Sequence, residues 1–172
     1  WDERHLAESG VPFTVLRPGG IVDPDDGEPF RSMARFARDR VPVRQFGPPT
    51  LPGVYVFTDE LAEFAVRAHA YPATWGQRFD IGGPSTLTRE HLWALIGEVI
   101  GRVPIVTFEP VEVLTRMRLE AEEAGDRGLV MRLAREEVAA QMELGAPDMA
   151  GMRGAFGGVE QRDLGEWLRT FL

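Results

Sequence analysis

Residues 9–22 have the sequence SGVPFTVLRPGGIV, in which a short apolar run meets an Arg-Pro-Gly-Gly break. The run from Phe13 to Leu16 is too short for a helix and is rich in residues that favour strands. The proline then removes a backbone donor, and the two glycines free the backbone, so the strand ends there. The pattern predicts a buried strand that runs into a loop. In an open parallel sheet, ligands bind at the carboxyl ends of the strands.

The composition is that of a globular protein. The chain has 172 residues, of which 44% are hydrophobic and 27% are charged, and it contains no cysteine. When it folds as one domain, a chain of this length buries roughly 70% of the surface that its unfolded form exposes. No apolar run approaches the roughly 18 residues of a membrane-spanning helix, and no basic and apolar leader opens the chain. We therefore expect no membrane partner and a cytoplasmic location, with which the lack of cysteine is compatible.

The charged residues exclude some functions. The formal net charge is −8 at pH 7, and no basic cluster offsets it, which argues against a nucleic-acid partner. All 19 basic residues are arginine. The chain therefore has no lysine that could form a Schiff base or lower the pKa of a neighbouring tyrosine.

The chain alternates predicted helices and strands, which indicates an α/β fold. Helices are predicted at about 2–9, 30–37, 58–68, 88–100, 111–124, 129–144 and 163–172, and strands at 13–16, 41–46, 54–57, 77–81 and 103–108. We expect the strands at 41–46 and 54–57 to pair in a small sheet, because only a Pro-rich loop separates them. Residues 146–158 are rich in Gly, Met and Ala, and we expect a loop there.

Polar residues predict where two of the helices begin. Thr88 is expected to cap the helix that ends at Gly101. Thr58 or Asp59 is expected to cap the helix that follows the strand at 54–57. Asp59 is also a candidate catalytic acid, but the capping role explains it without chemistry.

Four blocks of sequence resemble the C-terminal half of the extended and atypical short-chain dehydrogenase/reductases. This family includes NAD-dependent epimerases and dehydratases and the NmrA-like proteins. The blocks are Leu6–Gly10 with Phe13–Gly19, then Val56–Ala62, Phe79–Gly83 and Leu87–Arg102. They occur in the family's order and spacing and cover roughly residues 6–110. Residues 111–172 resemble the family only loosely, through the last helix.

The resemblance implies the C-terminal part of a Rossmann-type doubly wound sheet plus a small mixed α/β substrate-binding lobe. Residues 1–172 would form a single partial domain. In it, 1–22 and 77–101 would be late Rossmann elements, and 23–76 and 102–172 would be the substrate lobe and the C-terminal helices. The first residue, Trp1, is not methionine, which also leads us to expect a fragment.

The family's glycine-rich phosphate turn and its catalytic Tyr and Lys, which lie four residues apart, belong to the N-terminal half. Neither is present here. Tyr55 and Tyr71 are followed four residues later by Asp59 and Trp75. We therefore predict no catalytic residue in this chain.

The resemblance also implies a cofactor, NAD or NADP. One loop resembles the family loop whose backbone borders the nicotinamide, and its glycines would let the backbone approach a flat ring. Its residues are Arg17, Pro18, Gly19, Gly20 and Ile21. The alternative is a turn that only reverses the chain.

A small-molecule substrate is the expected partner. Four apolar side chains are candidates for the wall of its site, because the family's small lobe lines the substrate cavity. They are Phe30, Met33, Phe46 and Tyr55. The alternative for this set is a stripe of core residues.

Other patterns predict less. The glycines of 151–157 have the spacing of a dinucleotide fingerprint, but no apolar strand precedes them, which favours a flexible loop. The acidic run at 23–28 resembles a calcium loop with its glycine one place early, so we interpret it as a solvated turn. The three histidines are scattered, and we predict no metal site.

Three functions therefore stay open. The first is the substrate-binding portion of an NAD(P)-dependent oxidoreductase or epimerase-like protein, inactive alone. The second is an NmrA-like regulator that senses a dinucleotide without chemistry. The third is a self-standing small-ligand or interaction domain. Under the first, a severed sheet would expose a strand edge through which the chain could self-associate.

Overall fold

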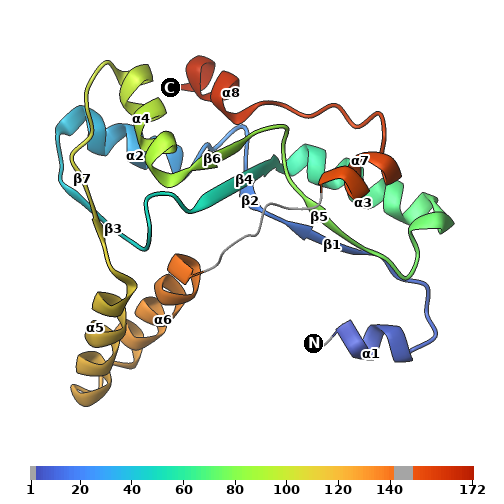
Figure 1. Ribbon diagram of the computed structural model, residues 1–172, viewed down its shortest axis with the longest axis horizontal. Coiled ribbons are helices and arrows are strands. Elements are labelled where there is room, and N and C mark those ends of the chain that lie inside the picture. The colour runs from blue at the N-terminus through green and yellow to red at the C-terminus, as the bar shows by residue number, and fades with distance from the viewer. Residues whose placement is uncertain (1–2, 142–148) are drawn as a thin grey trace. The chain divides into compact units, whose positions relative to one another are not determined.

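The computed structural model describes residues 3–141 and 149–172. Its elements confirm the predicted α/β class. They are α1 (Glu3–Glu8), β1 (Val15–Pro18), β2 (Gly20–Val22), α2 (Phe30–Asp39), β3 (Val43–Phe46), β4 (Pro52–Phe57), α3 (Thr58–Ala70), the 3-10 helix η1 (Pro72–Thr74), β5 (Arg78–Ile81), β6 (Thr86–Thr88), α4 (Arg89–Ile100), β7 (Val106–Glu109), α5 (Val111–Glu123), α6 (Arg127–Gln141), α7 (Met149–Ala155) and α8 (Leu164–Phe171) (Figure 1).

The chain divides into two compact units. Unit 1 comprises Trp1–Glu28, Gly53–Thr86 and Ala146–Phe171, and unit 2 comprises Pro29–Pro52, Leu87–Gly145 and Leu172. The boundaries of these units differ from the boundaries that we predict from the sequence. Residues 53–76, assigned to the substrate lobe in that division, lie in the same unit as 1–22.

Unit 1 contains two pairs of parallel strands. β1 pairs with β5, with Leu16 opposite Phe79, and β2 pairs with β4, with Ile21 opposite Val56. The first strand is shifted by two residues from the predicted 13–16. Its pairing begins where the Val15 amide donates to the Gln77 carbonyl at 3.0 Å.

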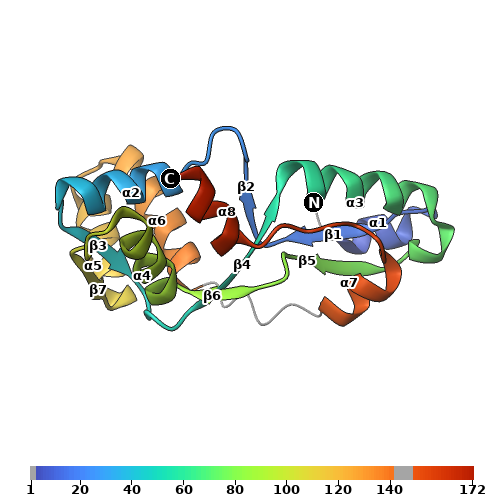
Figure 2. The same ribbon diagram turned by 90° about the horizontal axis from the view of Figure 1, so that it is seen from above.

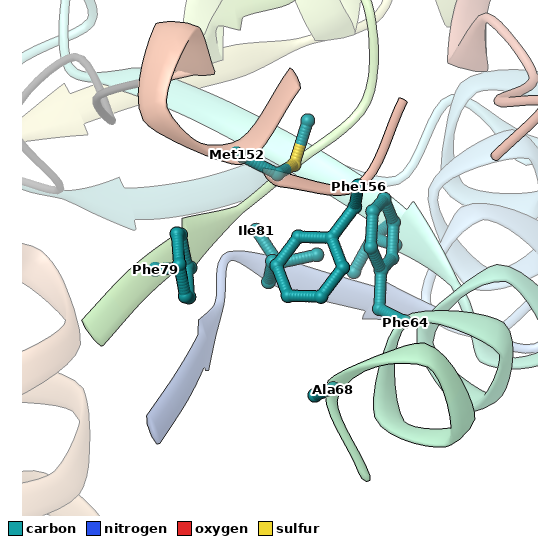
Figure 3. Packing of buried hydrophobic residues seen from close by; sticks show 7 residues of the cluster. Phe64, Ala68, Phe79, Ile81, Met152 and Phe156 are labelled. Carbon is teal, nitrogen blue, oxygen red and sulfur yellow. The ribbon is translucent and has the colours of Figure 1, made fainter. Parts of the chain in front are cut away.

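The core of unit 1 is built on aromatic contacts. Phe156 packs edge-on against Phe64 at 5.6 Å and against Phe79 at 4.9 Å between ring centroids (Figure 3). Ile81, Val56 and Met152, which are almost fully buried, and Ala68 complete the cluster. Figure 2 shows α3 and α7 on either side of β5.

The prediction of a loop over 146–158 is wrong for 149–155, because these residues form the helix α7. Met152 and Phe156 lie four residues apart, so both reach the same cluster. The Phe156 amide donates to the Met152 carbonyl at 2.8 Å. Tertiary packing thus stabilises a helix of weak propensity. Residues 146–148, and 142–144 of the preceding predicted helix, lie outside the described residues.

Unit 2 is organised around a third parallel pair, β3 with β7, in which Phe46 lies opposite Glu109. The helices α5 and α6 form a hairpin (Figure 1) whose core contains Leu114, Ala121, Leu133 and Ala140. The predicted pairing of the strands at 41–46 and 54–57 is wrong, because β3 pairs with β7 and β4 pairs with β2. Each parallel partner comes from a distant part of the chain, as parallel strands need a crossover connection.

One of the two predicted helix starts is confirmed. The Thr88 hydroxyl accepts from the His91 amide at 3.2 Å, and Gly101 closes α4 with φ of +71°. The prediction for α3 is wrong, because Phe57 is the N-cap and Thr58 and Asp59 lie in the first turn. The Glu60 carboxylate instead accepts from the Phe57 amide at 3.3 Å.

No helix in residues 3–141 and 149–172 combines the length and the apolar character needed to cross a membrane.

Replacement of Phe156 by alanine should destabilise the protein by about 3–5 kcal/mol, because it leaves a cavity among Phe64, Phe79 and Met152. Chemical denaturation would measure the free energy of unfolding. Val138→Ala, at a position 60% exposed on α6, is the control and should change stability by less than about 0.5 kcal/mol. Equal effects of the two substitutions would contradict the assignment of Phe156 to the core.

Candidate functional site

The carboxyl ends of β1 and β5 lie next to each other because the two strands are parallel. Each is followed by two glycines, Gly19-Gly20 and Gly82-Gly83, which we call the glycine edge. The Gly19 amide donates to the Ile81 carbonyl at 2.9 Å and joins the two ends. Ligands bind at this edge in open parallel sheets, so the glycine edge is the candidate site.

Three of these glycines are required by contacts inside unit 1. A Cβ on Gly20 would lie 2.5 Å from Cδ1 of Tyr55, and one on Gly83 would lie 2.5 Å from the Tyr55 carbonyl oxygen. A Cβ on Gly19 would lie 2.7 Å from Cγ2 of Val54. Real Cβ atoms do not approach so closely. The glycines therefore let the turns pack directly on β4.

The Arg17 side chain takes part in an ion-pair network on the protein surface. Its Nη2 donates to both carboxylate oxygens of Glu3, at 2.8 and 2.9 Å, and Arg78 donates to the same carboxylate. The bonds from Arg17 and then from Arg78 lower the pKa of Glu3, and the bond to Glu3 raises the pKa of Arg17. A role for Arg17 in cofactor binding would therefore use its backbone, as the resemblance implies.

A buried carboxylate lies at the junction of β4 and α3. Glu60 is 5% exposed, and its Oε1 accepts from the amide of Arg162 at 2.8 Å and from Nε at 3.0 Å. Arg162 also pairs with Asp59, and its guanidinium lies 4.2 Å from the centroid of the Phe57 ring. Burial lowers the pKa of Arg162, but the bonds to Glu60 and Asp59 outweigh this effect and raise it.

Sequence reasoning missed this arrangement. Glu60 and Arg162 are separated by about a hundred residues of sequence, and no local spacing connects them. The one available signal was the capping position near Asp59. The structure gives that role to Glu60 and uses Asp59 as a second partner of Arg162.

Two further polar side chains lie close to the edge. Gln161 donates from Nε2 to the Gly82 carbonyl. Ser85 bonds to Asp163, which also accepts from the Glu166 amide at 3.0 Å at the start of α8. The bond from Ser85 is the main cause that lowers the pKa of Asp163, followed by the amides of Glu166 and Gly165, while burial opposes them.

The polar side chains around the glycine edge are engaged in hydrogen bonds within the protein. In the described residues, no buried side-chain nitrogen or oxygen lacks a hydrogen-bond partner, and the polar groups around the edge bond to one another. Such groups hold a backbone surface in place. The described part of the chain also contains no cluster of three His, Cys, Asp or Glu suited to a metal.

The predicted substrate residues lie in both units. Tyr55 belongs to β4 of unit 1 and stands against Gly20. Phe30, Met33 and Phe46 belong to unit 2. Phe30 is 1% exposed, which fits the alternative of a core residue, whereas Phe46 lines a cavity.

In the acidic run at 23–28, the first carboxylate accepts hydrogen bonds from backbone amides of the same run. Asp23 Oδ1 accepts from the amides of Asp25 at 2.9 Å and Asp26 at 3.2 Å. This arrangement is a local turn stabilised by an aspartate and fits the interpretation of a solvated turn.

Solved structures share the architecture of this chain. A nucleoside-diphosphate-sugar epimerase from Staphylococcus aureus is 19% identical, has a TM-score of 0.64, and aligns over 97% of this chain and 55% of its own. This chain has an epimerase-like fold. A second structure, gox2253, is 18% identical, has a TM-score of 0.66, and aligns over 98% of this chain and 50% of its own. The chain thus spans about half the length of these two proteins.

A third structure aligns over a smaller part. The UDP-glucuronic acid 4-epimerase from Bacillus cereus, solved with UDP-glucuronic acid and NAD, is 17% identical over 62% of this chain and 35% of its own, with a TM-score of 0.51. No protein-family model and no curated protein matches the sequence. The structures confirm the epimerase-like, Rossmann-type fold that the sequence resemblance implies.

Replacement of Gly20 by valine should destabilise the protein by about 1–3 kcal/mol, because the new side chain overlaps the Tyr55 ring. Tyr55→Ala in the same chain should restore part of the loss, which a double-mutant cycle of unfolding free energies would measure. Gly154→Ala, within α7 at a position where a Cβ would meet no other atom within 4 Å, is the control and should stabilise the helix slightly. A cycle without coupling would contradict the close contact.

The lowered pKa of Asp163 predicts a dependence of stability on pH. Because the folded pKa lies below the unfolded value, the ionised group stabilises the fold fully above the unfolded value of about 3.9. The stabilisation disappears as the pH falls through the folded pKa. The difference in unfolding free energy between the wild type and Asp163→Asn should therefore shrink in acid, and Ser85→Ala should shift this change to higher pH. A difference that stays constant with pH would argue against the Ser85–Asp163 bond.

Proposed function

We propose that this chain is the substrate-binding portion of an NAD(P)-dependent oxidoreductase or epimerase-like protein. The observation that carries the proposal is the glycine edge, where two parallel strands end side by side and each is followed by two glycines. The chain would present this edge as one wall of the dinucleotide site. The shared fold supports the proposal, since the Bacillus cereus epimerase was solved with NAD and a nucleotide sugar.

The chain is proposed to be inactive alone and to be part of a longer protein. It has no lysine, and the polar groups at the glycine edge are bonded to one another. The phosphate-binding turn and the proton-transferring residues would come from sequence outside this chain. Unit 2 would belong to the substrate-binding lobe, and the protein would work in the cytoplasm.

A second candidate uses the same edge without chemistry. The absence of a free acid, base or nucleophile among the described residues of the edge favours a regulator of the NmrA-like kind, which would sense the dinucleotide. The sequence that precedes Trp1 in the gene would distinguish the two. A tyrosine and lysine four residues apart favour the enzyme, and a different pair favours the sensor.

The edge of β1 also bears on association. In the described residues, β1 pairs only with β5 in a two-stranded sheet, so its other edge offers backbone groups to a further strand. We propose that the chain self-associates through this edge when the rest of the sheet is missing. Light scattering of the isolated chain would show concentration-dependent dimers, and a strict monomer would exclude this association.

Hydrogen exchange with and without NAD(H) or NADP(H) tests the proposed site, in the longest protein that the gene encodes around this chain. The amides of Gly19, Gly20 and Gly82 should exchange more slowly with the dinucleotide, because the ligand covers the glycine edge. The amides of α5, in unit 2, are the internal control. Binding that protects no amide of the glycine edge would reject the proposed location, and no binding of either dinucleotide would reject the function.

A further inference from the structure

We propose that unit 2 contains a binding site for an oxyanion, the carboxylate or phosphate group of a small-molecule ligand. The site is a cavity of about 270 Å³ at the carboxyl end of β3. Its polar lining consists of Arg44, Gln45, Arg89 and Glu136, beside Phe46 and two alanines of α6. The proposal does not depend on the dinucleotide site, because all of these residues belong to unit 2.

Arg44 offers a pair of parallel donors. Its Nε donates to Glu109 at 3.2 Å, and its guanidinium lies 5.5 Å from the centroid of the Phe46 ring. These contacts orient the side chain, which is still 55% exposed. The two Nη groups lie outside the bond to Glu109 and have the spacing that binds a carboxylate or phosphate in a bidentate manner.

Gln45 is oriented as a second donor. The indole of Trp93, which is 6% exposed, donates from Nε1 to Gln45 Oε1 at 2.6 Å. An indole nitrogen can only donate, so the atom that faces it must be the amide oxygen. The acceptor of Gln45 is therefore used, and the amide nitrogen is the group left for a ligand in the cavity.

Arg89 supplies a positive charge that is already held in place. Its guanidinium donates to the Phe46 carbonyl at the end of β3 and to the Ala139 carbonyl of α6 at 2.9 Å. These two bonds connect the strand to the helix and fix the charge beside the cavity. A ligand would not have to order this side chain on binding, which lowers the entropic cost.

The remaining polar side chain opposes an anion. Glu136 is exposed on α6 at the rim of the cavity, where its carboxylate would repel a like charge. The carbonyls of Phe46 and Ala139 already accept from Arg89. The fixed groups of the cavity are therefore donors, and the one acceptor can turn to solvent, which favours an oxyanion over a cation.

Titration of the protein with sodium pyrophosphate in one arm and sodium malonate in the other tests the site, with sodium chloride at matched ionic strength as the control. The indole N–H signals in a ¹H–¹⁵N correlation spectrum report on it. The Trp93 signal should shift with saturation because the ligand contacts its partner Gln45, and those of Trp75 and Trp167 should stay in place. Pyrophosphate binding alone would identify a phosphate group, and malonate binding alone a carboxylate.

Two substitutions should change the affinity in opposite directions. Arg44→Gln removes the bidentate donor and should weaken binding about tenfold, the equivalent of about 1.4 kcal/mol. Glu136→Gln removes the repelling charge and should strengthen binding about threefold. Arg135→Gln, which alters the neighbouring charge on α6 outside the cavity lining, is the matched control and should have little effect.

Several results would overturn the proposal. These are no saturable shift of Trp93 with either anion, the same shift with chloride, or an Arg44→Gln variant that binds as well as the wild type. Weaker binding by Glu136→Gln would also overturn it. The dispersion of the indole signals reports whether each variant is folded. If Arg44→Gln is not folded, Gln45→Glu replaces it and should abolish binding, because it turns the donor into an anion.

Discussion

The bonds between Glu60 and Arg162 are the constraint on which unit 1 depends. A carboxylate that is 5% exposed would be strongly unfavourable without a partner, because burial removes its hydration. Glu60 is satisfied by the backbone and guanidinium of Arg162 and by the amide of Phe57. These bonds connect the junction of β4 and α3 to the segment before α8, more than a hundred residues away in sequence.

The glycines of the glycine edge are explained by close packing against β4. β4 is held by its junction with α3, and the turns after β1 and β5 approach it so closely that Gly19, Gly20 and Gly83 have no room for a Cβ. The glycines therefore have a structural cause inside the protein. The same lack of side chains brings the carboxyl ends of β1 and β5 directly against β4, and carboxyl ends of this kind are where ligands bind in open parallel sheets.

Unit 2 shows how the same kind of bond prepares a second polar site. The partners of Arg89 and Gln45 are a helix carbonyl, a strand carbonyl and a buried indole. None of these contacts is visible from spacing in the sequence, since β3, α4 and α6 are far apart along the chain. Of the predicted substrate residues, Phe46 lies in this cavity and Phe30 lies in the core, because the face of a helix or strand that becomes buried depends on its neighbours.

The sequence by itself determined the features that depend on neighbouring residues. These include the end of β1 at the Arg-Pro-Gly-Gly break and the start of α4 at Thr88 and its end at Gly101, because proline, glycine and capping side chains act within a few residues. The order of four sequence blocks was enough to predict the epimerase-like fold. Only the tertiary structure decided that β3 pairs with β7, that 149–155 form a helix, and that Glu60 bonds to Arg162. Each of these depends on a partner distant in the sequence, and the energy of such a contact is absent from any local pattern.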